Sequence, residues 1–141
     1  PVIGPATKVQ PVYVGDVAEA VAVLVDKGAA DGKTYELGGP ATATLQDMMQ
    51  YVVDVTQRKR LLLPLPHGAA KLLGLLIGWI PGAPINADQV ELLQGDNVVS
   101  AAAKAEGRDL AGLGITARSY ATIVPTYLYR FRKEGQFTVP N

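Results

Sequence analysis

The sequence has no cysteine and a single histidine, His67. Disulfides, thiolate zinc sites and a cysteine nucleophile are therefore excluded, and so is a histidine-rich metal site. Thirteen basic and thirteen acidic side chains cancel, so a nucleic-acid partner is not expected. Asp54, Asp88 and Asp96 are scattered without a ligand pattern, and no metal ligand is assigned.

Recognisable catalytic motifs are also missing from the chain. No G-x-G-x-x-G turn lies between a strand and a helix, and there is no Walker loop. Ser100, His67 and Asp96 lack the spacing and context of a catalytic triad, since no nucleophile elbow is present. We therefore assign no catalytic residue and no cofactor-binding residue to this chain.

What the sequence does contain is enough apolar material for a folded domain. Of its 141 residues, 48% are hydrophobic and 18% are charged, a composition that argues against disorder. The opening run, Pro1 to Pro5, resembles neither a signal peptide nor an initiation site and is interpreted as a loop entered from an earlier segment. We expect the chain to be the C-terminal portion of a longer protein.

The first forty residues predict a strand, a helix and a second strand. Residues 10–14 form a short β-rich run, and Asp16 with Glu19 has the spacing of a helix N-cap and its N3 partner. Apolar residues then recur at helical spacing until Lys27 and Gly28. Residues 33–39 predict a strand that ends in two glycines.

The rest of the chain reads as mostly helical. Thr44 and Asp47 predict a second capped helix, and Asn86 with Gln89 another that ends near Leu93. Residues 67–80 predict a buried helix, with docking on a partner or a lipid surface through Trp79 as the alternative. Residues 95–100 are expected to be extended, 101–113 to hold one short helix, and Thr116 to cap the last helix.

This inventory predicts a helix-rich α/β fold. Isolated parallel strands need neighbours to bury both faces, so the first forty residues are expected to belong to a larger sheet. We expect residues 1–40 to be the last strand–helix–strand unit of a Rossmann-type core and residues 41–141 to be a mostly helical, substrate-side domain. Exposed strand edges also predict that the chain self-associates unless the missing N-terminal half covers them.

Several motifs in order carry a resemblance to a known family. Residues 9–20 and 34–40 resemble the end of the core of extended short-chain dehydrogenases of the NAD-dependent epimerase/dehydratase type. Within that family the sequence is closest to the epimerase-like, NAD(P)H-binding accessory subunit of respiratory complex I and its bacterial relatives. The matching stretches of that narrower resemblance are 62–66, 88–93, 96–100, 113–115 and 127–137.

The resemblance implies an NAD(P)-binding, oxidoreductase-like parent protein whose reactive Tyr-x-x-x-Lys couple we expect outside this chain. Its implied cofactor is NAD(P)(H), with none expected for this chain alone, and its implied partners are complex I subunits. Its implied location is cytoplasmic, with a peripheral position on the inner face of a bacterial membrane as a further possibility. Alternative functions are a non-catalytic assembly or docking module, or a fragment of a nucleotide-sugar epimerase or dehydratase.

Val9 departs from the pattern of the sugar-nucleotide members. The resemblance implies an arginine at this position, because many sugar-nucleotide members carry one there that pairs with the substrate diphosphate. Valine cannot replace a cationic fork, and Lys8 is expected on the other face of an extended chain. The complex I-like alternative, in which binding matters more than turnover, is therefore favoured.

Three residues are candidates for the substrate side: Gln10, Tyr13 and Asp16. Tyr13 alternates with Val12 and Val14, so its side chain is expected on the opposite face, toward a cleft. Asp16 is explained by helix capping, with substrate contact as the alternative.

Overall fold

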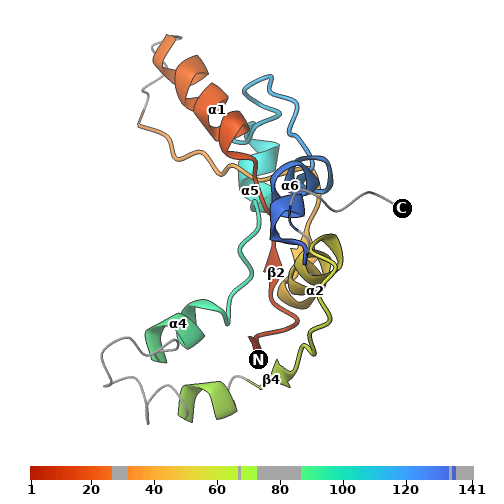
Figure 1. Ribbon diagram of the computed structural model, residues 1–141. Helices are drawn as coiled ribbons and strands as arrows, with labels where there is room; N and C mark the ends of the chain where they lie inside the picture. Colours follow the sequence, from red (N-terminus) through yellow and green to blue (C-terminus); the bar gives the residue numbers. More distant parts are fainter. Residues whose placement is uncertain (27–31, 67, 73–86, 134, 136–141) are drawn as a thin grey trace. The chain divides into compact units, whose positions relative to one another are not determined.

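The computed structural model describes residues 1–26, 32–66, 68–72, 87–133 and 135, and these divide into two compact units (Figure 1). Unit 1 comprises residues 1–9, 43–97 and 128–141, and unit 2 comprises residues 10–42 and 98–127. The two units thus interleave along the sequence. The domain boundary expected at residue 40 stays a prediction.

Unit 1 is organised by two pairs of very short strands. β1 (Val2–Ile3) pairs in parallel with β4 (Pro64–Leu65), and β2 (Lys8–Val9) pairs antiparallel with β3 (Ala43–Thr44). A bridge joins Val9 to Asn97, and the Asp96 carboxylate accepts a hydrogen bond from the Lys8 N–H at 2.8 Å. Lys8 is exposed and Val9 half-buried, as expected for alternating faces.

Helix α2 (Leu45–Val55) follows β3 directly and begins with the predicted capping box. The Thr44 hydroxyl accepts a hydrogen bond from the Asp47 N–H, and the Asp47 carboxylate accepts one from the Thr44 N–H. Unit 1 also contains a helical turn over residues 68–72 and helix α4 (Ala87–Leu92). Asn86 and most of the helix predicted over residues 67–80 lie outside the described residues.

Unit 2 is built on helix α1 (Val14–Asp26) and a short helix, α5 (Ala101–Ala105). Its apolar core joins Ala20 of α1 to three residues that follow α5, namely Leu110, Leu113 and Ile115. Val14, Val21 and Val25 of α1 are exposed. Such a surface suits pairing with further polypeptide, and the self-association expected from the sequence stays a prediction.

Two predicted strands do not form as strands. Residues 10–13 are irregular, because the Tyr13 carbonyl already accepts hydrogen bonds from the N–H groups of Asp16 and Val17 and so begins α1. Residues 33–39 are also irregular, and the Glu36 N–H donates to the carbonyl of Arg108 in a loop. A mixed α/β fold is confirmed, whereas a Rossmann-type core stays a prediction.

The last helix begins later than predicted. Thr116 does not cap it, because residues 116–119 are irregular and α6 runs from Tyr120 to Leu128 with Pro125 inside. A 3-10 turn, η1 (Tyr129–Phe131), follows it. Across the described parts of the chain, no helix combines the length and the apolar character that crossing a membrane requires.

Candidate functional site

Unit 2 contains a pocket of about 550 Å³, within the size range of small-molecule sites. Its walls come from the loop at Gly38 and Gly39, from α5 and from the segment that follows α5. The described lining residues are Gln10, Gly38, Gly39, Pro40, Val99, Lys104, Asp109, Leu110, Ala111, Gly114, Ile115, Thr116 and Ala117. Lys104 and Asp109 bring one positive and one negative side chain to an otherwise largely apolar wall.

Gln10 ties the walls of this pocket together. Its Nε2 donates to the Gly39 carbonyl at 2.6 Å, and its Oε1 accepts from the Val99 N–H at 2.9 Å. The two glycines permit this approach, since a Cβ on Gly39 would stand 2.0 Å from the Pro11 carbonyl oxygen and one on Gly38 would stand 2.6 Å from Gln10. Gln10 therefore positions the backbone of the pocket.

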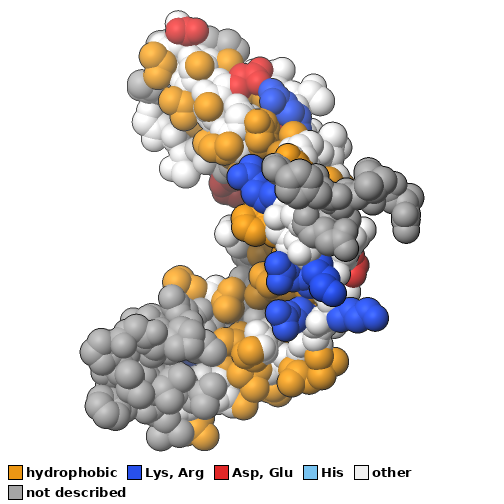
Figure 2. Space-filling view, viewed as in Figure 1, with side chains coloured by type: hydrophobic (Ala, Val, Ile, Leu, Met, Phe, Trp, Pro, Cys, Tyr) orange, Lys and Arg blue, Asp and Glu red, His pale blue; other side chains and the backbone are white. Residues whose placement is uncertain are grey.

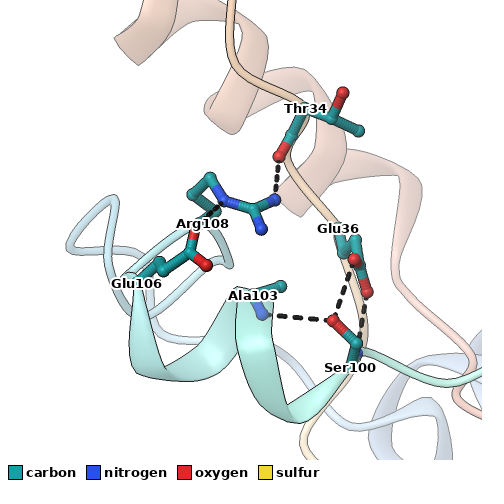
Figure 3. A network of polar contacts seen from close by, with 6 residues as sticks. All are labelled: Thr34, Glu36, Ser100, Ala103, Glu106 and Arg108. Atoms are coloured by element: carbon teal, nitrogen blue, oxygen red, sulfur yellow. Dashed lines mark hydrogen bonds and ion pairs between the residues drawn. The ribbon is translucent and has the colours of Figure 1, made fainter.

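A network of polar contacts holds the segment before these glycines against α5 (Figure 3). The Glu36 carboxylate accepts hydrogen bonds from the Ser100 N–H at 2.7 Å and from the Ser100 hydroxyl at 3.0 Å. The same hydroxyl accepts from the Ala103 N–H at 3.1 Å and so caps α5. Nearby, Arg108 donates to the Thr34 carbonyl and pairs with Glu106 at 2.7 Å.

These contacts favour the charged forms of the groups involved. The hydrogen bond from the Ser100 backbone N–H, followed by that from its hydroxyl, holds the pKa of Glu36 below its ordinary value. The hydrogen bond from Arg108 likewise lowers the pKa of Glu106, and the same bond raises the pKa of Arg108. The network is thus a set of charge-assisted contacts that fixes the loop leading into Gly38.

Asp16 lies inside α1 and not at its N-cap, so the capping box predicted with Glu19 is wrong. Its side chain is fully buried, at 0% exposure, and its Oδ2 accepts the Arg118 backbone N–H at 2.7 Å. The Arg118 Nε lies 3.1 Å from Oδ1 as an ion pair. The physical reason for the difference is that a partner 102 residues away recruits the carboxylate.

The structure separates the three candidate residues of the sequence into two places. Gln10 lines the pocket, whereas Tyr13 and Asp16 both meet Arg118. The Arg118 guanidinium lies 5.1 Å from the centre of the Tyr13 ring, a cation–π distance, and also 3.5 Å from Glu19. Tyr13 and Asp16 therefore share a partner that fixes the start of α1 beside residue 118.

Sequence reasoning missed Arg118, Lys104 and Asp109. None of them belongs to a local motif, because each acquires its role from residues far away in the chain or from the shape of the pocket. The Asp109 carboxylate accepts a hydrogen bond from the Gly112 N–H at 2.8 Å and so shapes the turn after α5. Of the residues around the pocket, Ser100 did carry a sequence signal for its role: it precedes an alanine-rich segment, as the N-cap residue of a helix should.

One expectation about catalytic motifs needs correction. The sequence does contain a Tyr-x-x-x-Lys spacing, at Tyr129 and Lys133. Tyr129 lies in η1, which ends at Phe131, and Arg132 is already extended. The two residues therefore do not share a turn of α-helix, as this spacing would require for them to lie on one face.

A second near-match to a nucleotide-binding motif lies after α5. Gly112 to Ala117 has the spacing G-x-G-x-x-A. No strand precedes it, and α6 begins only at Tyr120, so the strand–turn–helix context of a dinucleotide site is missing. Among the residues that the structure describes, no group of three acidic, histidine or cysteine side chains is placed to hold a metal ion.

Comparison with known proteins gives the chain its relatives. No protein-family model matches the sequence. It is 38% identical over 107 residues to the Arabidopsis thaliana protein named NADH dehydrogenase (ubiquinone) 1 alpha subcomplex subunit 9, mitochondrial. The matched region covers 69% of this chain and 27% of the plant protein. The Rattus norvegicus protein of the same name is 32% identical over 99 residues, 70% of this chain and 26% of the rat protein. This chain is related to a subunit of NADH dehydrogenase.

The matched region is only part of those relatives, since the chain spans about a quarter of their length. The relation to a complex I accessory subunit that the sequence motifs predicted is thereby confirmed. A shorter match, 43% identical over 49 residues, is to a protein of Oryza sativa subsp. japonica named Cyclin-B1-2. It covers 34% of this chain and 12% of the rice protein, too little to indicate a function.

Proposed function

We propose that the protein containing this chain is an accessory subunit of an NADH dehydrogenase, with an extended short-chain dehydrogenase fold that binds NAD(P)(H) without turning it over. The observation that carries this proposal is the relation to the subunit 9 proteins over more than two-thirds of the chain. In this proposal the chain supplies the substrate-side wall of the fold, and the dinucleotide is held by residues that precede it.

The residues described here fit the substrate side better than the phosphate end of a dinucleotide. Pyrophosphate binding requires a glycine-rich turn that leads directly into a helix N-terminus, and Gly112 to Ala117 lacks that context. The pocket of unit 2 instead offers apolar surface together with the side chains of Lys104 and Asp109. We propose Lys104 as the residue that faces a ligand, with Gln10, Tyr13 and Asp16 as positioning residues.

The sugar-nucleotide alternative has no support from the structure. Val9 lies in β2, where its backbone pairs with Ala43 and its half-buried side chain offers no donor to a diphosphate. Calorimetric titration of the full-length protein with UDP- and dTDP-sugars should therefore give no binding. Binding in the millimolar range or tighter would revive this alternative.

Loss and restoration of the gene test the accessory role. Deleting it should reduce the amount of assembled NADH dehydrogenase on native gels stained for NADH oxidation, and the wild-type gene should restore it. A Gln10→Ala gene should restore assembly but weaken ligand binding, because Gln10 holds the pocket walls together. An unchanged amount of active complex after deletion would contradict the proposal.

Cofactor binding is tested separately, by fluorescence titration with NADPH. The full-length protein should bind the dinucleotide, and the 141-residue chain alone should not. Binding by the short chain would place the dinucleotide site within it and overturn the assignment above.

A further inference from the structure

Six of the thirteen cationic side chains of this protein come from two short segments that unit 1 brings together. We call them the basic surface: Arg58, Lys59, Arg60, Arg130, Arg132 and Lys133. The first segment follows α2 and the second lies in and after η1. In Figure 2, Lys and Arg side chains gather around the position of α2. The first segment contains no acidic residue, and Glu134 directly follows the second.

Reciprocal hydrogen bonds join the two segments. The Arg58 Nε donates to the Phe131 carbonyl at 3.0 Å, and the Arg132 Nε donates to the Val55 carbonyl at 3.0 Å. Each arginine thus uses its Nε to fix the opposite segment; Arg58 is exposed and Arg132 is half-buried. A sequence separation of more than seventy residues makes this clustering a product of the fold.

The turn after α2 sets the direction in which the chain leaves the helix and enters the first segment. Gln57 adopts a left-handed conformation, with φ 53°, and the N–H groups of Gln57 and Arg58 donate to the carbonyls of Asp54 and Val53. This is the hydrogen-bond pattern of a Schellman motif. The nearest acidic side chain along α2, Asp54, accepts a hydrogen bond from Gln50 at 2.8 Å.

Exposed apolar side chains accompany the cations in both segments. Leu61 follows Arg60 and is 81% exposed, and Phe131 lies between two arginines and is 53% exposed. Cations beside protruding apolar groups match the boundary of a bilayer, where charged heads meet lipid phosphates and apolar groups enter the acyl region. Within the described part of the chain, Lys59, Arg60 and Lys133 have no ion-pair partner.

We propose that the basic surface docks this protein on the anionic headgroups of a phospholipid bilayer, with Leu61 and Phe131 entering the interface. Mobile headgroups can match six cations spread over two segments, whereas an acidic protein partner would need carboxylates in a fixed complementary arrangement. Each lysine or arginine near an anionic membrane contributes modestly and the contributions add. The peripheral position considered from the sequence thereby acquires a specific surface, and the proposal does not depend on the accessory role.

Vesicle sedimentation with the full-length protein tests this proposal. The protein should pellet with phosphatidylcholine vesicles that contain phosphatidylglycerol, should stay in solution with phosphatidylcholine alone, and should be released by added salt. Combining Lys59→Gln, Arg60→Gln and Lys133→Gln should weaken binding about 100-fold, since each of the three cations is worth roughly fivefold. Leu61→Ser should weaken it about 3- to 10-fold with little change in salt dependence.

A matched variant controls for net charge. Combining Lys8→Gln, Lys33→Gln and Lys71→Gln removes the same charge outside the basic surface and should retain most of the binding. Circular dichroism verifies that both triple variants are folded. Equal loss of binding in the two triple variants would overturn the proposal, as would wild-type protein that fails to bind anionic vesicles at low salt or binds an acidic protein or nucleic acid in preference to them.

Discussion

The two units of this chain are stabilised in different ways. In unit 1, helix α2 begins and ends with contacts among neighbours, the capping box of Thr44 and the turn at Gln57. In unit 2, the start of α1 depends on Arg118, and α5 is tied to Glu36, 64 residues away. The comparison implies that the destabilising effect of a single substitution should reach distant elements of unit 2 but should remain local in unit 1.

The largest effect is expected from Arg118→Ala. The substitution leaves the fully buried Asp16 carboxylate without its guanidinium partner, although the Arg118 backbone N–H still donates to it. Because the Arg118 side chain is itself 51% exposed, we expect a cost of about 2–3 kcal/mol, that of leaving a buried acceptor under-satisfied. Urea unfolding followed by circular dichroism should show the loss in the free energy of unfolding. Hydrogen exchange should show it in α1 and in residues 110–117 before it appears in α2.

Two companions sharpen this test. Arg60→Ala removes an exposed arginine of unit 1 and should change the free energy of unfolding by less than about 0.5 kcal/mol. Adding Asp16→Asn to Arg118→Ala should recover part of the loss, because the uncompensated charge is gone. A loss below about 1 kcal/mol for Arg118→Ala would remove the contrast between the units.

An intermediate effect is expected from Ser100→Ala. It deletes the N-cap of α5 and one hydrogen bond to Glu36, which should lower the free energy of unfolding by about 1–2 kcal/mol at neutral pH. Thermal unfolding of the variant and of wild type gives the difference. Thr42→Ala, at an exposed position in an irregular segment, is the control.

The pH dependence of stability tests the Glu36 contact independently. Because the pKa of Glu36 is lower in the folded protein than its ordinary value of 4.5, its contribution is present above that value and is lost as the pH falls through the folded pKa. Glu36→Gln should flatten the stability profile in this acidic range, and Glu106→Gln separates the contribution of the other glutamate. A profile unchanged by Glu36→Gln would contradict the assignment.

The smallest effect is expected from Gln57→Gly. A non-glycine residue with φ 53° is strained, so glycine should stabilise unit 1 by up to about 1 kcal/mol. Gln57→Ala keeps a Cβ and should change little. Melting temperatures of the two variants provide the comparison, and a clear destabilisation by glycine would show that the turn depends on the glutamine side chain.

The same contrast explains which features the sequence predicted. The capping box at Thr44 was predictable because Thr44 and Asp47 are three residues apart. Asp16 with Glu19 has the same kind of spacing, yet the carboxylate of Asp16 is recruited by a distant arginine. The strand-like runs at 10–14 and 33–39 have β-rich composition but meet loops and a helix start instead of strand partners.

The candidate site follows the same rule. Gln10 belongs to a motif that the sequence makes visible and lies at the pocket, while its substrate-side role stays a prediction. Lys104 and Asp109 were not, because a pocket formed by folding leaves no spacing pattern in the sequence. The basic surface was missed for a related reason, since a net charge of zero conceals two basic segments that only the fold places together.

The stoichiometry of the purified NADH dehydrogenase tests the central claim most directly. Quantitative mass spectrometry of the complex, isolated from the organism through a tag on a core subunit, should detect peptides of this chain in a constant, near-equimolar ratio to that subunit. An accessory subunit should keep this ratio through a second purification step. Absence of these peptides from a complex that oxidises NADH at its full rate would contradict the proposed function.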